Sequence, residues 1–472
     1  MSTNLSPQNG GEKLGQGGFG CVVRPAIACR RKQQPPPNSV SKITYVIPGY
    51  ESDYEDELHM LKRIRIIDPD QKYFISVFDE CELDTRVTSN RNPKDLVEVS
   101  FDDEDLEEFS VRSSEPKYIS RMKKQAIQQK YCLVDSDLEP RNQIQVFGGY
   151  GLDEITQEVH PKIYNAIRKK YKSVVRHLIH GLHVMHHNRI AHRDIKEFNM
   201  LGMLAPTPNT PQKKNTPARR TTNKRQAKPA DKKQATTTNK SKIHKRTQRQ
   251  TKIQSPDNPL VRYIDFGLSE FINPGQDEGG IRNFHWSGTD GYIPIEYLIL
   301  YYMRDYINTY GISTTSQPDN KKRIIDKVCD RYERKYKSFY EDIHVEQSLM
   351  SPTRTTHSFF NTDEISKIFD RLVKSLSDGT FYKLQKTDYT GLVYKSDVFA
   401  LGITLAFIRR YYRLQHDRKL KNLITKMIKI SAEDRPTTLE CLQHPFFSAK
   451  KSLNHPFFSA KKSLNHPNHL LF

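Results

Sequence analysis

The stretch HRDIKEFN, residues 192–199, decides how the rest of the chain is interpreted. It places a histidine, an arginine, an aspartate, a lysine and an asparagine within eight residues. A charged surface turn is one interpretation of this composition. The alternative is a catalytic loop in which the carboxylate of Asp194 accepts a proton from a hydroxyl group, assisted by Lys196 and Asn199.

The segments on either side of this stretch favour the catalytic interpretation. Apolar residues recur at helical spacing over residues 158–190, which predicts one long amphipathic helix, or two in succession, before the loop that holds Asp194. Beyond a long polar stretch, LVRYIDFGL at 260–268 predicts a short strand that ends at Asp265. Asp265 and Asn199 offer the oxygen ligands that a Mg²⁺ ion bridged to phosphates requires.

A glycine-rich turn, GQGGFGCV at 15–22, lies between two strand-like runs. Glycines let backbone N–H groups approach phosphate oxygens that a Cβ atom would block, although an ordinary glycine turn fits the same pattern. No helix follows the turn, which argues against a dinucleotide-binding fold. Lys42 lies in a strand-like run, and a helix predicted over 54–67 offers Glu57, or alternatively Glu55, to fix a buried phosphate-binding lysine.

Seven motifs therefore follow in order: GxGxFGxV, a strand lysine, a helix glutamate, HRDxKxxN, DFG, GTxGYxPxE and DVFALG. Together they resemble the eukaryotic-type protein kinase superfamily over most of residues 11–450. The resemblance implies an α+β, bilobal protein kinase fold, with a small β-rich N-lobe and a larger helical C-lobe. It implies ATP and Mg²⁺ as cofactors, with Mn²⁺ as an alternative metal. A scaffold that binds partners without phosphotransfer is the competing function, but the residues that such proteins usually lack are all present.

The resemblance also implies a role for each matching residue. Asp194 and Lys196 match the catalytic aspartate and the lysine that steadies the transferred phosphoryl group, while Asn199 and Asp265 match the metal ligands. Lysine at position 196 is typical of serine/threonine kinases, so protein Ser or Thr hydroxyls are the expected acceptors. The expected nucleotide-binding residues are Gly15, Gly17, Gly18, Phe19, Gly20, Val22, Val23, Lys42, Glu57, Val146 and Gly149.

Other matches concern architecture. Gly288 and Thr289 resemble the Gly-Thr pair that lines a substrate site, and Glu296 is expected to pair with Arg435. Asp397 is expected to brace the catalytic loop. The segment joining the two lobes is placed at Val146–Gly149 by spacing, with Gln145 just before it. Glu57 is preferred over Glu55 because it leaves Leu58 and Leu61 facing the core, as in family members.

Arg193 precedes Asp194, and in the family such an arginine often receives a phosphate on the activation loop. A usual position for that phosphate, three residues before Gly288, is occupied by His285. Ser287 is the nearest hydroxyl. We therefore predict that activity does not strictly require phosphorylation of this loop.

The expected organisation has two lobes with large insertions. A disordered N-terminus (1–10) precedes an N-lobe (11–149) that carries an insertion at 84–131. A C-lobe (150–450) carries a disordered basic insert (204–258) and a second insertion (297–393). The eleven-residue sequence HPFFSAKKSLN at 444–454 recurs at 455–465, so 451–472 is expected to be a duplicated, solvated tail. These insertions resemble those of divergent kinases of large DNA viruses, of iridovirus-like type.

The basic insert accounts for most of the net charge of +20, because residues 205–253 hold fifteen Lys or Arg and one acid, Asp231. A solvated loop, a nuclear-localisation or unspecific nucleic-acid-binding tract, and a site of self-phosphorylation are three interpretations. The six cysteines lie far apart and are expected to be reduced thiols. Without a signal peptide or an apolar run long enough to span a membrane, the chain is expected to be intracellular. Host cytoplasm is the expected location, with nucleus and virion as alternatives, and a monomer is the default.

Overall fold

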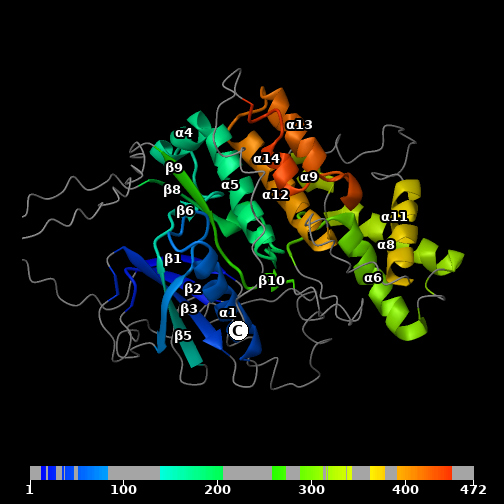
Figure 1. Ribbon diagram of the computed structural model, residues 1–472, viewed down its shortest axis with the longest axis horizontal. Coiled ribbons are helices and arrows are strands. Elements are labelled where there is room, and N and C mark those ends of the chain that lie inside the picture. The colour runs from blue at the N-terminus through cyan, green and yellow to red at the C-terminus, as the bar shows by residue number, and fades with distance from the viewer. Residues whose placement is uncertain are drawn as a thin grey trace, which may run out of the picture.

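Figure 1 shows a computed structural model of the chain. The structure describes residues 12–17, 20–27, 35–36, 38–46, 51–82, 139–205, 258–272, 288–311, 315, 317–335, 337–342, 362–377 and 391–448. The expected disordered N-terminus (1–10), the insertion at 84–131 and the tail at 451–472 lie outside the described residues, as does nearly all of the basic insert.

The N-terminal part forms one five-stranded antiparallel sheet, in which the strands lie in the order β1-β2-β3-β5-β4. Its strands are β1 (Glu12–Gly17), β2 (Gly20–Arg24), β3 (Ser39–Val46), β4 (Val77–Glu82) and β5 (Glu139–Val146). The glycine-rich turn joins β1 to β2 as a hairpin, with Gly17 opposite Gly20. Lys42 lies in the central strand β3, opposite Val22 on one side and Gln143 on the other.

Helix α1 (Ser52–Ile67) connects β3 to β4 and packs against the sheet. Tyr54, Glu57, Leu58, Leu61 and Ile64 recur at helical spacing and are all buried. The same spacing leaves Glu55 exposed on the opposite face. The sequence pattern of α1 therefore places one carboxylate, that of Glu57, on the face that packs against the sheet.

The rest of the chain is mainly helical (Figure 1), and it contributes most of one large hydrophobic core that also includes residues of α1 and the sheet. Its helices are α4 (Pro161–Lys169), α5 (Tyr171–His187), α6 (Ile295–Tyr310), α8 (Pro318–Lys335), α9 (Lys337–Asp342), α11 (Thr362–Ser377), α12 (Leu392–Tyr411), α13 (Arg418–Met427) and α14 (Thr438–Leu442), with short 3-10 turns at Glu197–Asn199 (η3) and Ala432–Asp434 (η5). The helical run predicted over 158–190 is two helices, which meet at Lys170.

Two small antiparallel sheets connect these helices to the N-terminal part. One has the order β6-β8-β9 and the other pairs β7 with β10. Their strands are β6 (Tyr150–Gly151), β7 (Ile190–Ala191), β8 (Met200–Leu204), β9 (Pro259–Tyr263) and β10 (Glu270–Phe271). Leu204 lies opposite Pro259, and the N–H of Ala205 donates to the carbonyl of Asn258 at 2.8 Å. The basic insert therefore begins and ends at neighbouring backbone positions.

Helices α6, α8 and α11 pack together at one end of the molecule, on the right of Figure 1. Apart from the first two residues of α6, they come from the segment 297–393, which was expected to be an insertion in the C-lobe. Helix α8 begins at Pro318. Proline is well accommodated at the first position of a helix, where its missing N–H has no partner to lose.

The mixed α+β class expected from the sequence is observed. The expectation of reduced thiols is wrong for Cys21 and Cys81, which are disulfide-bonded, whereas Cys329 and Cys441 are free. The spacing of cysteines in a sequence does not by itself decide whether they form disulfides. Among the helices in the described ranges, none has the length and apolar character needed to cross a membrane.

Candidate active site

A cleft of about 540 Å³ lies where the five-stranded sheet meets the helical part. Strands β1, β2, β3 and β5 contribute lining residues from one side, and η3, β8 and the segment after β9 contribute from the other. A volume of this size is typical of a small-molecule site. Most of the residues that the sequence singled out lie in or beside this cleft.

Lys42 enters the cleft from the central strand and forms an ion pair with Glu57. Its Nζ lies 2.5 Å from Oε1 of Glu57 and 3.7 Å from Oδ1 of Asp265. Glu57 is 4% exposed, so this pair is shielded from water. Burial by itself would lower the pKa of Lys42, but the carboxylates of Glu57 and Asp265 outweigh it and raise that pKa above its ordinary value. Lys42 is therefore a fixed positive charge at the inner end of the cleft.

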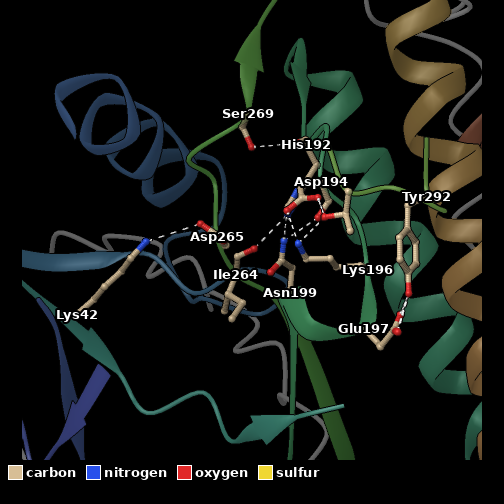
Figure 2. Close-up of polar contacts among 11 residues, drawn as sticks. Lys42, His192, Asp194, Lys196, Glu197, Asn199, Ile264, Asp265, Ser269 and Tyr292 are labelled. Atoms are coloured by element: carbon tan, nitrogen blue, oxygen red, sulfur yellow. Dashed lines mark hydrogen bonds and ion pairs between the residues drawn. The ribbon is translucent and has the colours of Figure 1, made fainter. Parts of the chain in front are cut away.

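Asp194 is the centre of a hydrogen-bonded group on the opposite side (Figure 2). Asn199 Nδ2 donates to the Asp194 carbonyl and to its Oδ2, both at 2.8 Å. Lys196 Nζ lies 2.9 Å from the same Oδ2. The hydroxyl of Thr289 accepts from Lys196 Nζ and donates to Asp194 Oδ1, each at 2.6 Å. Both oxygens of the Asp194 carboxylate are thus held in a fixed orientation.

The loop that carries Asp194 is held from below by Asp397, on the buried helix α12. Its Oδ2 accepts from the N–H of His192 at 2.8 Å and lies 3.0 Å from His186 Nε2, while its Oδ1 accepts from the N–H of Arg193 at 2.8 Å. Arg193 has a φ of 67°, a left-handed conformation that costs energy for a residue with a Cβ atom. The buried Asp397 carboxylate stabilises this conformation, and Asp397 thus braces this loop, as the sequence motifs predict.

Asp265 and Asn199, the expected metal ligands, both line the cleft. Backbone hydrogen bonds position them together, because the N–H of Ile264 donates to the carbonyl of Asn199 at 3.0 Å. Asp265 has a φ of 61°, and its buried Oδ1 has no donor within hydrogen-bond distance, the nearest cation being Lys42 Nζ at 3.7 Å. A buried carboxylate oxygen normally has a donor or a metal, so the residues fit a hard divalent cation held by oxygen ligands.

The residues expected from the glycine-rich hairpin differ in their relation to the cleft. Gly15, Gly17 and Gly20 lie in β1 and β2, whereas Gly18 and Phe19 lie outside the described residues. Val22 lines the cleft. Val23 does not, because neighbouring residues of a strand point to opposite faces of the sheet, and its side chain is buried on the other face. Val22, and not Val23, therefore faces the cleft, and nucleotide contact by Val23 stays a prediction.

The connector between the two parts lies where spacing predicted it. Gln145 and all four residues of Val146–Gly149 line the cleft. Gly149 has a φ of 115°, and a Cβ atom there would collide with the carbonyl oxygen of Gly202 on β8. Glycine is therefore required at 149 by a close backbone approach, which keeps the connector against the small β6-β8-β9 sheet.

The expected architectural pair is present and fully buried. Arg435 Nη2 lies 2.7 Å from Oε2 of Glu296, and the two side chains are 0% and 3% exposed. Arg435 also donates to the backbone carbonyls of Lys429 and Ile430. This pair connects the start of α6 to the segment before α14, so it stabilises the packing of helices around the site without lining the cleft.

Several site residues were missed by sequence reasoning. Apolar side chains from both parts line the cleft: Leu14, Val40 and Leu201, which strand alternation could have indicated, and Ile75 and Ile264, which lie just outside the strands. Tyr292 donates to both oxygens of the buried Glu197 at 2.5 and 2.6 Å. Burial raises the pKa of Glu197, and the hydrogen bond from Tyr292 opposes that rise. Nη1 of Arg193 lies 2.6 Å from Oε2 of Glu270 on β10.

Comparison with known proteins adds no assignment, because no protein-family model matches the chain and no curated protein sequence matches it.

Proposed function

We propose that the protein is an ATP-dependent serine/threonine protein kinase. One observation carries the proposal: four segments that are far apart in the sequence bring Lys42, Glu57, Asp194, Asn199 and Asp265 to the two sides of one cleft. The order of the motifs could arise by chance in unrelated segments, but their convergence on one site could not easily do so. The sheet with α1 on one side of the cleft and the helical part on the other support the finer assignment of a bilobal kinase fold.

The nucleotide would enter between the two parts. The apolar side chains of Leu14, Val22 and Leu201 would enclose a flat aromatic base, and the backbone of Val146–Gly149 would offer N–H and C=O groups to its edge. Lys42 would hold phosphate oxygens, because Glu57 fixes its position and keeps it charged. Asp265 and Asn199 would hold a Mg²⁺ ion, whose positive charge would offset that of the phosphates during transfer.

Asp194 would orient the acceptor hydroxyl and accept its proton. One carboxylate oxygen is hydrogen-bonded to Thr289 and the other to Asn199, so little reorientation would be needed during the reaction. Lys196, 2.9 Å from this carboxylate, would stabilise negative charge on the phosphoryl group as it passes to the acceptor. The preference for serine or threonine rests on the family resemblance of Lys196 alone.

The test is transfer of labelled phosphate from ATP in the presence of Mg²⁺, onto the protein itself and onto a basic generic acceptor, followed by phosphoamino-acid analysis. The matched variant is Asp194→Ala, whose fold and ATP binding are checked by thermal shift. Phosphoserine or phosphothreonine made by the wild type and lost in the variant is the expected result. Absence of transfer by a wild type that ATP stabilises would refute the kinase and favour a nucleotide-binding scaffold.

A further inference from the structure

The segment 288–294, called the acceptor loop here, lies between the catalytic loop and the helices α8 and α9. On the catalytic side, Thr289 donates to Asp194 and Tyr292 donates to Glu197. Gly288 has a φ of 111°, and a Cβ atom at this position would lie 2.7 Å from the carbonyl oxygen of Arg193. The position of the acceptor loop therefore determines whether two side chains reach the catalytic loop.

On its other side, the acceptor loop receives hydrogen bonds from two buried tyrosines. Tyr332 on α8 donates to the carbonyl of Ile293 at 3.2 Å, and Tyr340 on α9 donates to the carbonyl of Gly291 at 3.1 Å. Their side chains are 2% and 0% exposed. Burial raises the pKa of Tyr340 above its ordinary value, so its hydroxyl keeps the proton that it donates.

An ion pair and an aromatic contact add to these hydrogen bonds. Arg331 Nη2 lies 3.1 Å from both carboxylate oxygens of Asp290. The ring of Tyr292 contacts that of Phe339, with centroids 5.4 Å apart. Gly291 has a φ of 90°, and a Cβ atom there would lie only 3.1 Å from the Phe339 ring. The acceptor loop is thus fitted closely against α8 and α9 along most of its length.

We propose that Arg331, Tyr332, Phe339 and Tyr340, the α8–α9 clamp, position the acceptor loop so that Thr289 and Tyr292 reach the catalytic loop. These four are positioning residues, since none of them lines the cleft. The assignment deepens the proposed kinase function and rests on it. It gives the helical segment 297–393 a role in catalysis. Gly288 and Gly291, both with positive φ, leave the backbone of the acceptor loop with many accessible conformations, and the clamp stabilises the one in which Thr289 and Tyr292 reach the catalytic loop.

The test uses the double variant Tyr332→Phe, Tyr340→Phe, which removes the two hydroxyl donors and keeps both buried rings. The control is Lys321→Ala, which breaks an ion pair of 2.6 Å between α8 and Asp370 on α11 but does not touch the acceptor loop. We expect kcat/KM for a histone acceptor to fall about tenfold or more in the double variant, with KM for ATP unchanged. The control should behave like the wild type. Arg331→Gln, at a partly exposed position, should act in the same direction and serves if the buried variant folds poorly.

Hydrogen exchange separates this inference from the proposed function, because it needs no activity. Backbone amides of 288–294 should exchange faster in the double variant than in the wild type or in Lys321→Ala. Unchanged exchange would overturn the clamp even if the wild type is an active kinase. A rise in KM for ATP that matches the fall in acceptor kcat/KM would also overturn it, since the effect would then extend beyond the acceptor site. If the wild type transfers no phosphate but the acceptor loop exchanges faster in the double variant, the proposed kinase function is refuted and the clamp's positioning of the loop is supported.

Discussion

Replacing Thr289 by valine would remove one hydroxyl from the centre of the candidate active site while preserving side-chain shape. That hydroxyl accepts from Lys196 Nζ and donates to Asp194 Oδ1, each at 2.6 Å. Lys196 would keep its direct contact of 2.9 Å with Oδ2, so the carboxylate would lose its hold on one oxygen only. A hydrogen bond to a charged group contributes about 1.5–3 kcal/mol, which corresponds to a loss of roughly 10- to 150-fold in kcat.

Steady-state phosphotransfer at saturating ATP is the appropriate assay, with Thr289→Ser as the matched control. Serine keeps the hydroxyl and loses only a methyl group, so it should retain most of the activity. KM for ATP should stay near the wild-type value in both variants, because the hydroxyl contacts the catalytic residues and not Lys42 or the apolar lining. A valine variant with wild-type kcat would refute the view that Thr289 orients Asp194, and equal losses in valine and serine would assign the effect to packing.

Four further predictions concern Glu57, two histidines of α5, two serines and the basic insert. Glu57→Ala should lower kcat/KM for ATP by roughly tenfold or more, because Lys42 loses its charged hydrogen-bond partner, whereas Glu55→Ala on the exposed face should have no effect; steady-state kinetics with varied ATP distinguishes them. The fold should lose stability between about pH 6.5 and pH 4, because burial lowers the pKa of His177 and His183 to about 4 in the folded chain. The unfolded chain therefore binds these protons first as the pH falls, and each imidazole then lowers the free energy of unfolding by about 1 kcal/mol after allowance for solvent screening. Chemical denaturation at pH 7 and pH 5 measures this loss, which should be smaller in His177→Gln. A Ser269→Ala, Ser287→Ala double variant should keep full activity in the phosphotransfer assay, and loss of activity that a phosphomimetic restores would contradict this. Deleting 206–257 should abolish any salt-dependent binding to nucleic acid, measured by fluorescence anisotropy at two salt concentrations, because nearly all of the cationic excess of residues 205–253 lies there.

The sequence predicted which residues lie in the site better than it predicted the contacts that position them. Lys42, Glu57, Asp194, Asn199 and Asp265 could be named in advance because each belongs to a short local motif, and spacing within α1 favours Glu57 over Glu55. The α8–α9 contacts could not be anticipated, since they join residues 39 and 49 positions apart through tyrosine hydroxyls and backbone carbonyls. A tyrosine in a helical pattern indicates a buried ring, but the pattern does not say which carbonyl its hydroxyl will reach.

Some expectations differ from the structure for local reasons. Val23 was expected to bind the nucleotide together with Val22, whereas the alternation along β2 leaves only Val22 in the cleft lining. Cys21 and Cys81 were expected to be reduced because the six cysteines are widely spaced, but this spacing does not exclude disulfides, and both are disulfide-bonded. The Phe198 side chain in HRDIKEFN is 57% exposed and lines the cleft, a position that the motif alone did not assign.

The contacts of Arg193 bear on whether the acceptor side of the site needs an added phosphate. Arg193 already lies 2.6 Å from the carboxylate of Glu270, which sits on β10 directly opposite Ala191. The Glu270 carboxylate therefore supplies a negative charge close to where a loop phosphate would be expected, and the α8–α9 clamp holds the acceptor loop from the other side. Glu270 is half exposed, so the pair contributes modestly to stability and more to the orientation of Arg193. Both contacts come from unmodified side chains, which is the physical reason to expect activity without loop phosphorylation.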